Sequence, residues 1–276
     1  MNPATPVNPE EYQALLLAMQ DVLGVVVTEE KRDLISDRLG SVMQRHAISS
    51  LSELASRMRE TAGDGLNTQV LEALSAHDSG WSSHLELARL LNMYILPSVA
   101  GSTKKKFRIW VTGCGHGQLA YAVAMQIAEY RQSHNLNTEF EIEATDISAS
   151  DIAQAKTGRF EESMLDGLSS AYQKKYLKPD DGAWSVNPAI RKMVKFSTRD
   201  LLRPFTVMGH FDLVICTDVL IYFSATVRRQ ILDEFARLLD PSGMLIVGSS
   251  ESVVPFSQSY ERVAHEAGVF YRQLPH

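Results

Sequence analysis

The chain has 276 residues with a net charge of −6, and 45% of them are hydrophobic and 22% charged. These proportions exclude a disordered chain, and the negative charge argues against a nucleic-acid partner held by bulk electrostatics. The sequence contains neither a basic, apolar leader nor a run of about 18 apolar residues, so we expect a cytoplasmic protein that does not insert into a membrane.

The first quarter of the chain has the pattern of a helical domain. Apolar residues recur at helical spacing from residue 8 to about residue 59. Asn8–Pro9 is typical of one helix start and Thr28–Glu30 of a second. Because no alternating strand pattern occurs here, we expect four short helices up to about residue 74 and a helical domain over residues 1–76.

Residues 77–106 have the composition of a linker. A polar stretch, SAHDSGWSSH, is followed by helical spacing in LELARLLNMYILP and then by the basic, turn-rich AGSTKKK. We therefore expect a linker helix and a loop here.

From residue 107 onward, short β-branched and aromatic runs alternate with helical runs. The helical runs begin near Gln118, Ser148 and Ala225. The runs that predict strands are FRIWVTG, FEIEATD, KFSTRD, FDLVICTD, GMLIVGS and GVFYRQL. Such alternation predicts an α/β domain with a doubly wound, mostly parallel sheet over residues 107–276, and we expect the last strand to be antiparallel at an edge. The two cysteines, Cys114 and Cys216, lie in apolar runs, which predicts buried free thiols and no metal site.

A glycine loop follows the first predicted strand and leads into a helix. Gly113-Cys114-Gly115-His116-Gly117 departs from the dinucleotide pattern, which would need glycine where Gln118 stands. It matches instead the loop that class I methyltransferases place beside a nucleoside sulfonium. Asp146 ends the second predicted strand, where its carboxylate can accept from both ribose hydroxyls of an adenosine. A tight turn with a capping aspartate, or a nicotinamide dehydrogenase, is the alternative.

Four segments together carry a resemblance to a known family. They are RIWVTGCGHGQLAYAVAM (108–125), ATDIS (144–148), VLIYF (219–223) and GSSES (248–252). In this order and spacing they resemble the chemoreceptor glutamate methyltransferases, the CheR family. The resemblance implies an N-terminal helical domain, a linker, and a class I methyltransferase (Rossmann-like) domain with a small inserted β-subdomain around residues 172–196. It also implies S-adenosylmethionine as cofactor, S-adenosylhomocysteine as product, and the cytoplasmic domain of methyl-accepting chemotaxis receptors as substrate of a monomeric enzyme.

The resemblance also implies positions for the site residues. The implied cofactor-binding residues are Ser79, Gly113, Cys114, Gly115, Gly117, Asp146, Ile147, Asp200, Leu201, Thr217 and Asp218. Tyr222 is expected to line the methyl-transfer pocket and to orient the acceptor. Ser83 is expected at the catalytic position where relatives have an arginine.

Several positions depart from the family pattern. Leu119 replaces an acid that in relatives holds the cofactor ammonium, and we expect Asp200 and Asp218 to supply that negative charge instead. Helix capping and solvation at strand ends are the alternative reading of these two carboxylates. The departures leave open a family member that binds the cofactor as a regulator without transfer, or one that methylates another acceptor. The sequence also leaves open whether the chemosensory system serves flagella or type IV pili.

Lys31, Arg38 and Arg45 lie seven residues apart along the second predicted helix, beside the apolar line Ile35, Leu39 and Val42. In the resembling family a basic N-terminal helix contacts the acidic receptor bundle, so these cations are expected to bind the partner. A solvated helix face is the alternative. The loop within residues 178–186 has a single glycine, which predicts no binding of a receptor C-terminal pentapeptide.

Overall fold

The structure is a computed structural model that describes residues 8–27, 32–60, 65–75, 81, 85–134 and 136–274. Contacts divide the chain into two compact units, one of Met1–Ala76 with Leu220–Gln230 and one of His77–Val219 with Ile231–His276. No helix within the described ranges is long and apolar enough to cross a membrane.

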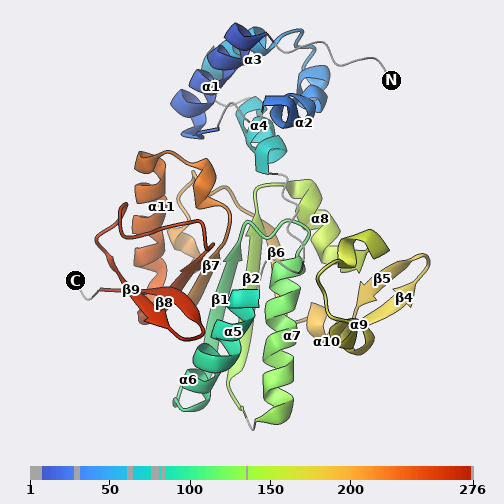
Figure 1. Cartoon of the computed structure of the whole chain (residues 1–276), viewed down its shortest axis with the longest axis vertical. Helices are drawn as coiled ribbons and strands as arrows, with labels where there is room; N and C mark the ends of the chain where they lie inside the picture. The colour runs from blue at the N-terminus through green and yellow to red at the C-terminus, as the bar shows by residue number, and fades with distance from the viewer. Residues whose placement is uncertain are drawn as a thin grey trace. The chain divides into compact units, whose positions relative to one another are not determined.

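The first unit contains the predicted helices. In the described part of its N-terminal segment these are α1 (Pro9–Leu23), α2 (Arg32–Arg45), α3 (Leu51–Glu60) and α4 (Leu66–Ser75) (Figure 1). Asn8 caps α1 as predicted, because its side chain accepts from the backbone N–H of Glu10 at 3.0 Å. The predicted start at Thr28–Glu30 lies outside the described residues. Tyr12, Leu15, Leu39 and Leu54 are fully buried.

A segment from far along the chain completes this unit. It consists of the 3₁₀ turn η6 (Leu220–Tyr222) and the beginning of α11 (Ala225–Leu238). The backbone N–H of Val26 donates to the carbonyl of Tyr222 at 2.8 Å, and that of Ser224 donates to the carbonyl of Gly24 at 2.6 Å. Residues 220–230, which the sequence predicts to be part of the second domain, group with the first unit, because no local pattern indicates these long-range bonds.

The second unit is built on a seven-stranded sheet in its described part, with the order β6-β2-β1-β7-β8-β10-β9. The strands are β1 (Lys106–Thr112), β2 (Glu139–Asp146), β6 (Val194–Thr198), β7 (Phe211–Cys216), β8 (Leu239–Val247), β9 (Tyr260–His265) and β10 (Gly268–Gln273). The first five strands of that order pair in parallel, which confirms the doubly wound prediction. The last strand, β10, is antiparallel as expected, but β9 covers it and forms the edge.

The predicted linker helix belongs to the second unit. It forms α5 (Leu85–Leu90), the π-helical turn η3 (Leu91–Ile95) and α6 (Leu96–Ala100). Leu87, Leu90, Leu91 and Ile95 are buried in the same core as Val111 of β1 and Val123 of α7 (Gln118–Ser133). Residues 85–100 are therefore an integral layer of this unit and not a free connection.

The inserted subdomain is a three-stranded antiparallel sheet of β3 (Arg159–Phe160), β5 (Ala183–Val186) and β4 (Leu177–Asp180). It lies beside the large sheet, to the right of α7 in Figure 1. With it come α8 (Ala149–Thr157), η4 (Glu162–Leu165), α9 (Ser170–Tyr176) and α10 (Pro188–Arg191). The predicted range of 172–196 begins too late, because β3 precedes it, and ends too late, because residues 194–196 pair with β2 in the large sheet.

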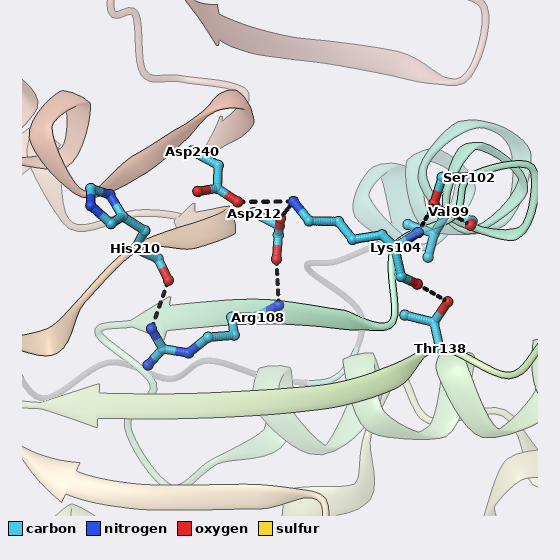
Figure 2. Close-up of polar contacts among 8 residues, drawn as sticks. All are labelled: Val99, Ser102, Lys104, Arg108, Thr138, His210, Asp212 and Asp240. Atoms are coloured by element: carbon cyan, nitrogen blue, oxygen red, sulfur yellow. Dashed lines mark hydrogen bonds and ion pairs between the residues drawn. The ribbon is translucent and has the colours of Figure 1, made fainter.

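A polar cluster fastens the amino ends of three strands. The Lys104 ammonium contacts the carboxylates of Asp212 in β7 and of Asp240 in β8, the latter at 2.8 Å (Figure 2). Asp212 also accepts from the backbone N–H of Arg108 in β1 at 2.7 Å. This cluster holds the sheet from the side opposite to the carboxyl ends of the parallel strands.

Candidate cofactor site

The strand order defines a crevice at the carboxyl ends of the parallel strands. From β1 the chain proceeds to β2 and β6 on one side, and β7 and β8 lie on the other side. The order therefore reverses between β1 and β7, and ligands of doubly wound sheets bind at such a switch point. The last residues of β1 and β7, Thr112 and Cys216, are paired neighbours there.

The glycine loop follows β1 at this point. Gly113, Gly115 and Gly117 have φ angles of 66°, 49° and 91°, a region that favours glycine. An added Cβ at Gly113 would lie 2.3 Å from Val219 Cγ2, and one at Gly117 would lie 3.0 Å from the Phe196 ring. Packing therefore excludes a side chain at Gly113 unless Val219 moves, and leaves little room for one at Gly117.

Asp146 connects the loop to the end of β2. Its carboxylate accepts from the backbone N–H of Gly115 at 2.8 Å and from that of Ser148 at 3.0 Å, and the residue is 4% exposed. Each carboxylate oxygen can accept more than one hydrogen bond. Asp146 can therefore stabilise the turn and still accept hydrogen bonds from a ligand. Ile147 follows it and is half-buried.

Gln118 and Leu119 start α7 next to the loop and differ in chemistry. Gln118 is 5% exposed, and its Oε1 has no hydrogen-bond partner within the described ranges. Leu119 is 3% exposed and lines an apolar cavity of about 130 Å³ with Trp81 and Leu87. The position at which relatives have an acid is thus part of an apolar cluster, whereas the orphaned acceptor is one residue earlier.

The segment after β7 contributes Thr217 and Asp218. The backbone N–H of Asp218 donates to Glu251 Oε2 at 3.0 Å, and that of Gly248 donates to the same oxygen at 2.7 Å. Glu251 is 8% exposed and was not among the predicted site residues, although GSSES was part of the resemblance. An acid inside a Gly/Ser loop after an apolar strand was the available signal. A cavity of about 280 Å³ is lined by Thr217, Asp218, Glu251, Leu87, Leu90 and Tyr271, among others.

Three carboxylates lie at the crevice, those of Asp146, Asp218 and Glu251, and Arg262 also lines the cavity of about 280 Å³. Burial raises the pKa of the Cys114 thiol well above its usual range, and the nearby Asp146 adds to the effect. Burial and then Glu251 and Asp218 do the same for the pKa of Cys216. Both thiols are free and buried as predicted, and no cluster of three or more metal-binding side chains occurs among the described residues. Carboxylates and an orphaned amide oxygen suit a cationic ligand that carries hydroxyl donors.

Asp200 is separated from Asp218 by the sheet order. Asp200 follows β6 and Asp218 follows β7, three strand spacings apart, or about 14 Å at about 4.8 Å per spacing. The Asp200 carboxylate accepts from the backbone N–H of Leu202 at 2.8 Å, within a turn that follows β6 and not at the start of a helix. The described contacts do not join the two carboxylates, and the expectation that both serve one ammonium stays a prediction. A position of Asp200 and Leu201 near the adenine, beside Asp146, stays a prediction.

The remaining predicted residues are not brought to this crevice by the described contacts. Ser79, Ser83 and Lys31 lie outside the described residues. Tyr222 belongs to the first unit, and its catalytic role stays a prediction.

The basic residues of α2 lie beside its predicted apolar line. Arg38 Nη1 donates to the carbonyl of Leu74 at 3.2 Å, and the exposed Arg45 donates through Nε to the carbonyl of Ser41 at 3.3 Å. The side chains of the apolar line, Ile35, Leu39 and Val42, are buried. Partner binding by these cations stays a prediction.

Comparison with known proteins supports the resemblance over nearly the whole chain. A chemotaxis protein methyltransferase of Pseudomonas putida, Cher2, is 31% identical over 267 residues, which are 95% of this chain and 97% of that one. Chemotaxis protein methyltransferase 1 of Pseudomonas aeruginosa is 33% identical over the same length and shares of both chains. A solved TehB-like SAM-dependent methyltransferase from Corynebacterium glutamicum is 14% identical, with a TM-score of 0.39 over 72% of this chain and 89% of that one, which is too weak a likeness to support a conclusion. The model of the CheR methyltransferase family, SAM binding domain, matches residues 80–269, more than half of the sequence, and the chain therefore belongs to the CheR methyltransferase family.

Proposed function

We propose that this chain transfers the methyl group of S-adenosylmethionine to glutamate side chains on the cytoplasmic domain of methyl-accepting chemotaxis receptors. The observation that carries the proposal is the hydrogen bond between Gly115 and Asp146 at the switch point, in a chain of the CheR family. It joins the two elements that a nucleoside sulfonium needs, a close backbone and a ribose acceptor.

The residues at the crevice fit the cofactor. Asp146 would accept from the ribose hydroxyls, with the backbone of Gly113–Gly117 and Ile147 beside it. Asp200 and Leu201 would lie toward the adenine. Thr217 and Asp218 would face the methionine moiety, and the orphaned Gln118 Oε1 is an acceptor for its ammonium. The fit is therefore one of acceptors to a cationic ligand.

Little catalytic machinery is needed beyond placement. The cofactor supplies a methyl group that its sulfonium already activates. The acceptor glutamate, with a pKa of about 4.3, is ionised at neutral pH and needs no general base. Placing carboxylate and methyl in line can contribute roughly 7 to 11 kcal/mol. Tyr222 and Ser83 are the residues proposed to position the acceptor.

The partner surface is proposed on α2. Arg45 is exposed, so its charge is available to an acidic receptor bundle, whereas Arg38 is also bonded to the end of α4. Lys31 would extend the same line. The enzyme is proposed to act in the cytoplasm as a monomer, without nucleic acid.

A second candidate is a cofactor-binding regulator without transfer. Leu119, buried in an apolar cluster, favours it because relatives hold the ammonium with an acid at this position.

Calorimetry with S-adenosylmethionine and S-adenosylhomocysteine, beside a labelled-methyl assay on receptor signalling domains, tests both candidates. Binding together with transfer supports the enzyme. Binding without transfer in every receptor assayed supports the regulator, and no binding of either compound contradicts both.

A further inference from the structure

Glu251 is a buried carboxylate that no step of methyl transfer uses directly. It is 8% exposed and lies four residues beyond the end of β8. One of its oxygens, Oε2, accepts from the backbone N–H groups of both Gly248 and Asp218, at 2.7 and 3.0 Å. A buried carboxylate is unfavourable unless its hydrogen bonds are made, and here they join the loop after β8 to the loop after β7.

The bond to Asp218 holds an unfavourable backbone conformation. Asp218 has a φ of 60°, in the left-handed region that non-glycine residues seldom occupy, although aspartate tolerates it better than most. Such conformations persist where the surroundings fix them. The acceptor oxygen of Glu251 is the group that meets the Asp218 N–H in this conformation.

The neighbouring glycine permits the close approach. A Cβ on Gly248 would lie 2.8 Å from Asp218 Oδ1 and 3.0 Å from Glu251 Oε2. Any side chain at this position would therefore push the two carboxylates out of place. Asp218 and Glu251 also line the same cavity of about 280 Å³, together with Thr217.

We infer that Glu251 is a positioning residue, which fixes Asp218 in its left-handed conformation so that the Asp218 carboxylate faces the cationic end of the cofactor. The inference rests on the proposed function, because it requires Asp218 to contact the cofactor. Glu251 acts through its acceptor oxygen rather than through its charge, since both bonds end on one oxygen that an amide would also present.

Calorimetry with S-adenosylmethionine on full-length variants tests this role. Glu251→Ala should weaken binding about tenfold or more, because it leaves the N–H groups of Gly248 and Asp218 without this acceptor. Glu251→Gln should bind within about twofold of wild type, because its carbonyl oxygen accepts the same two N–H groups. The matched control is Glu234→Ala, which removes a carboxylate that accepts a backbone N–H from Phe205 at 3.3 Å outside the crevice and should leave the affinity unchanged.

Coupling to Asp218 separates positioning from general stability. Asp218→Gly adopts a positive φ without strain but has no carboxylate to place, so Glu251→Ala should have little further effect on affinity in that background. Kinetically, Glu251→Ala should raise KM for the cofactor by a larger factor than it lowers kcat. If Glu251→Ala does not fold, the cofactor affinity of Glu251→Gln is the remaining measurement of the role of the acceptor oxygen.

Three results would overturn the inference. They are wild-type affinity in folded Glu251→Ala, a tenfold loss in Glu251→Gln, and an undiminished effect of Glu251→Ala beside Asp218→Gly. If Asp218→Gly itself binds the cofactor as tightly as wild type, the assignment of Asp218 fails and the proposed site needs revision. A loss in Asp218→Gly without one in Glu251→Ala refutes the positioning role alone.

Discussion

The Asp146 carboxylate accepts two structural hydrogen bonds, one from the backbone N–H of Gly115 in the glycine loop and one from that of Ser148 in the turn before α8. Asp146→Ala should weaken the binding of S-adenosylmethionine by at least about 1 kcal/mol, because a charged acceptor is lost from the ribose. Calorimetry measures the change, and the exposed Asp166→Ala is the control. Unchanged affinity in a folded Asp146→Ala variant would remove Asp146 from the site.

Leu119 gives a second prediction at this scale. Restoring an acid with Leu119→Glu should not restore a family-like site, because the side chain is 3% exposed and packs with Trp81 and Leu87. An unpaired buried carboxylate should lower the free energy of unfolding by about 1–3 kcal/mol or more. Urea unfolding measures this, with Ala153→Glu on the exposed face of α8 as control. A stable variant with tighter cofactor binding would show instead that this side chain faces the ligand.

Residue roles could be predicted only where a local pattern carries them. The glycines and Asp146 stand in an order that indicates a loop and a strand end, and the structure joins them by a hydrogen bond. Glu251 was missed because its role depends on Asp218, 33 residues away. The separation of Asp200 from Asp218 required the strand order, which the sequence does not contain.

At the scale of elements, the Lys104 cluster ties the loop after α6 to β7 and β8. Asp212 is 5% exposed, so Lys104→Met would leave a buried carboxylate next to that of Asp240, with the backbone N–H of Arg108 as its remaining described donor. Breaking a fully buried pair costs about 3–5 kcal/mol. Because the Lys104 side chain is 36% exposed, urea unfolding at neutral pH should show a smaller loss, of about 1–3 kcal/mol. Lys105→Met, at an exposed neighbour, is the control, and a loss no greater than the control's would mean that the cluster does not stabilise the sheet.

The same cluster predicts a dependence on pH. Partial burial opposes the charge of Lys104, yet hydrogen bonds to Asp212 and Asp240 raise its pKa above the usual 10.5. A group whose folded pKa is raised stabilises the protein below its unfolded pKa and loses this contribution as the pH rises through the folded value. The difference in unfolding free energy between wild type and Lys104→Met should therefore be constant near pH 8 and shrink above about pH 10.5. A difference that grows above that pH would contradict the sign.

Helices and strands in which apolar residues recur regularly could be predicted from the sequence, whereas short or exposed elements could not. The helical spacing of α1 to α4 and the apolar runs of β1, β2, β7 and β8 gave their type and order. β9 was missed because only its first residue, Tyr260, is buried and its sequence has no continuous apolar run, and β3 because it has only two residues. The layer of α5 to α6 was predicted as a helix, but its burial depends on the sheet beneath it.

In the whole molecule, no single point of the sequence separates the two compact units, because each unit contains two separate segments of the chain. Residues 220–230 belong with the N-terminal helices, through bonds such as that from Val26 to Tyr222 at 2.8 Å. A fragment of residues 77–276 should therefore unfold at a lower temperature than the second unit of the full chain, because Phe223 loses the bridge to Val25. Calorimetric scans of both proteins measure this. Equal midpoints would mean that the two units are independent at residue 76.

Esterification of receptor glutamates by this CheR-family chain is measured by the label that alkali releases after transfer. Receptor signalling domains are incubated with the enzyme and S-adenosylmethionine carrying a labelled methyl group, and then treated with base, which hydrolyses methyl esters to volatile methanol. We expect volatile label from wild-type enzyme, much less from Asp146→Ala, and none from receptors whose acceptor glutamates are replaced by alanine. Cofactor binding without volatile label from any receptor domain, or label that alkali does not release, would rule out glutamate esterification by this chain.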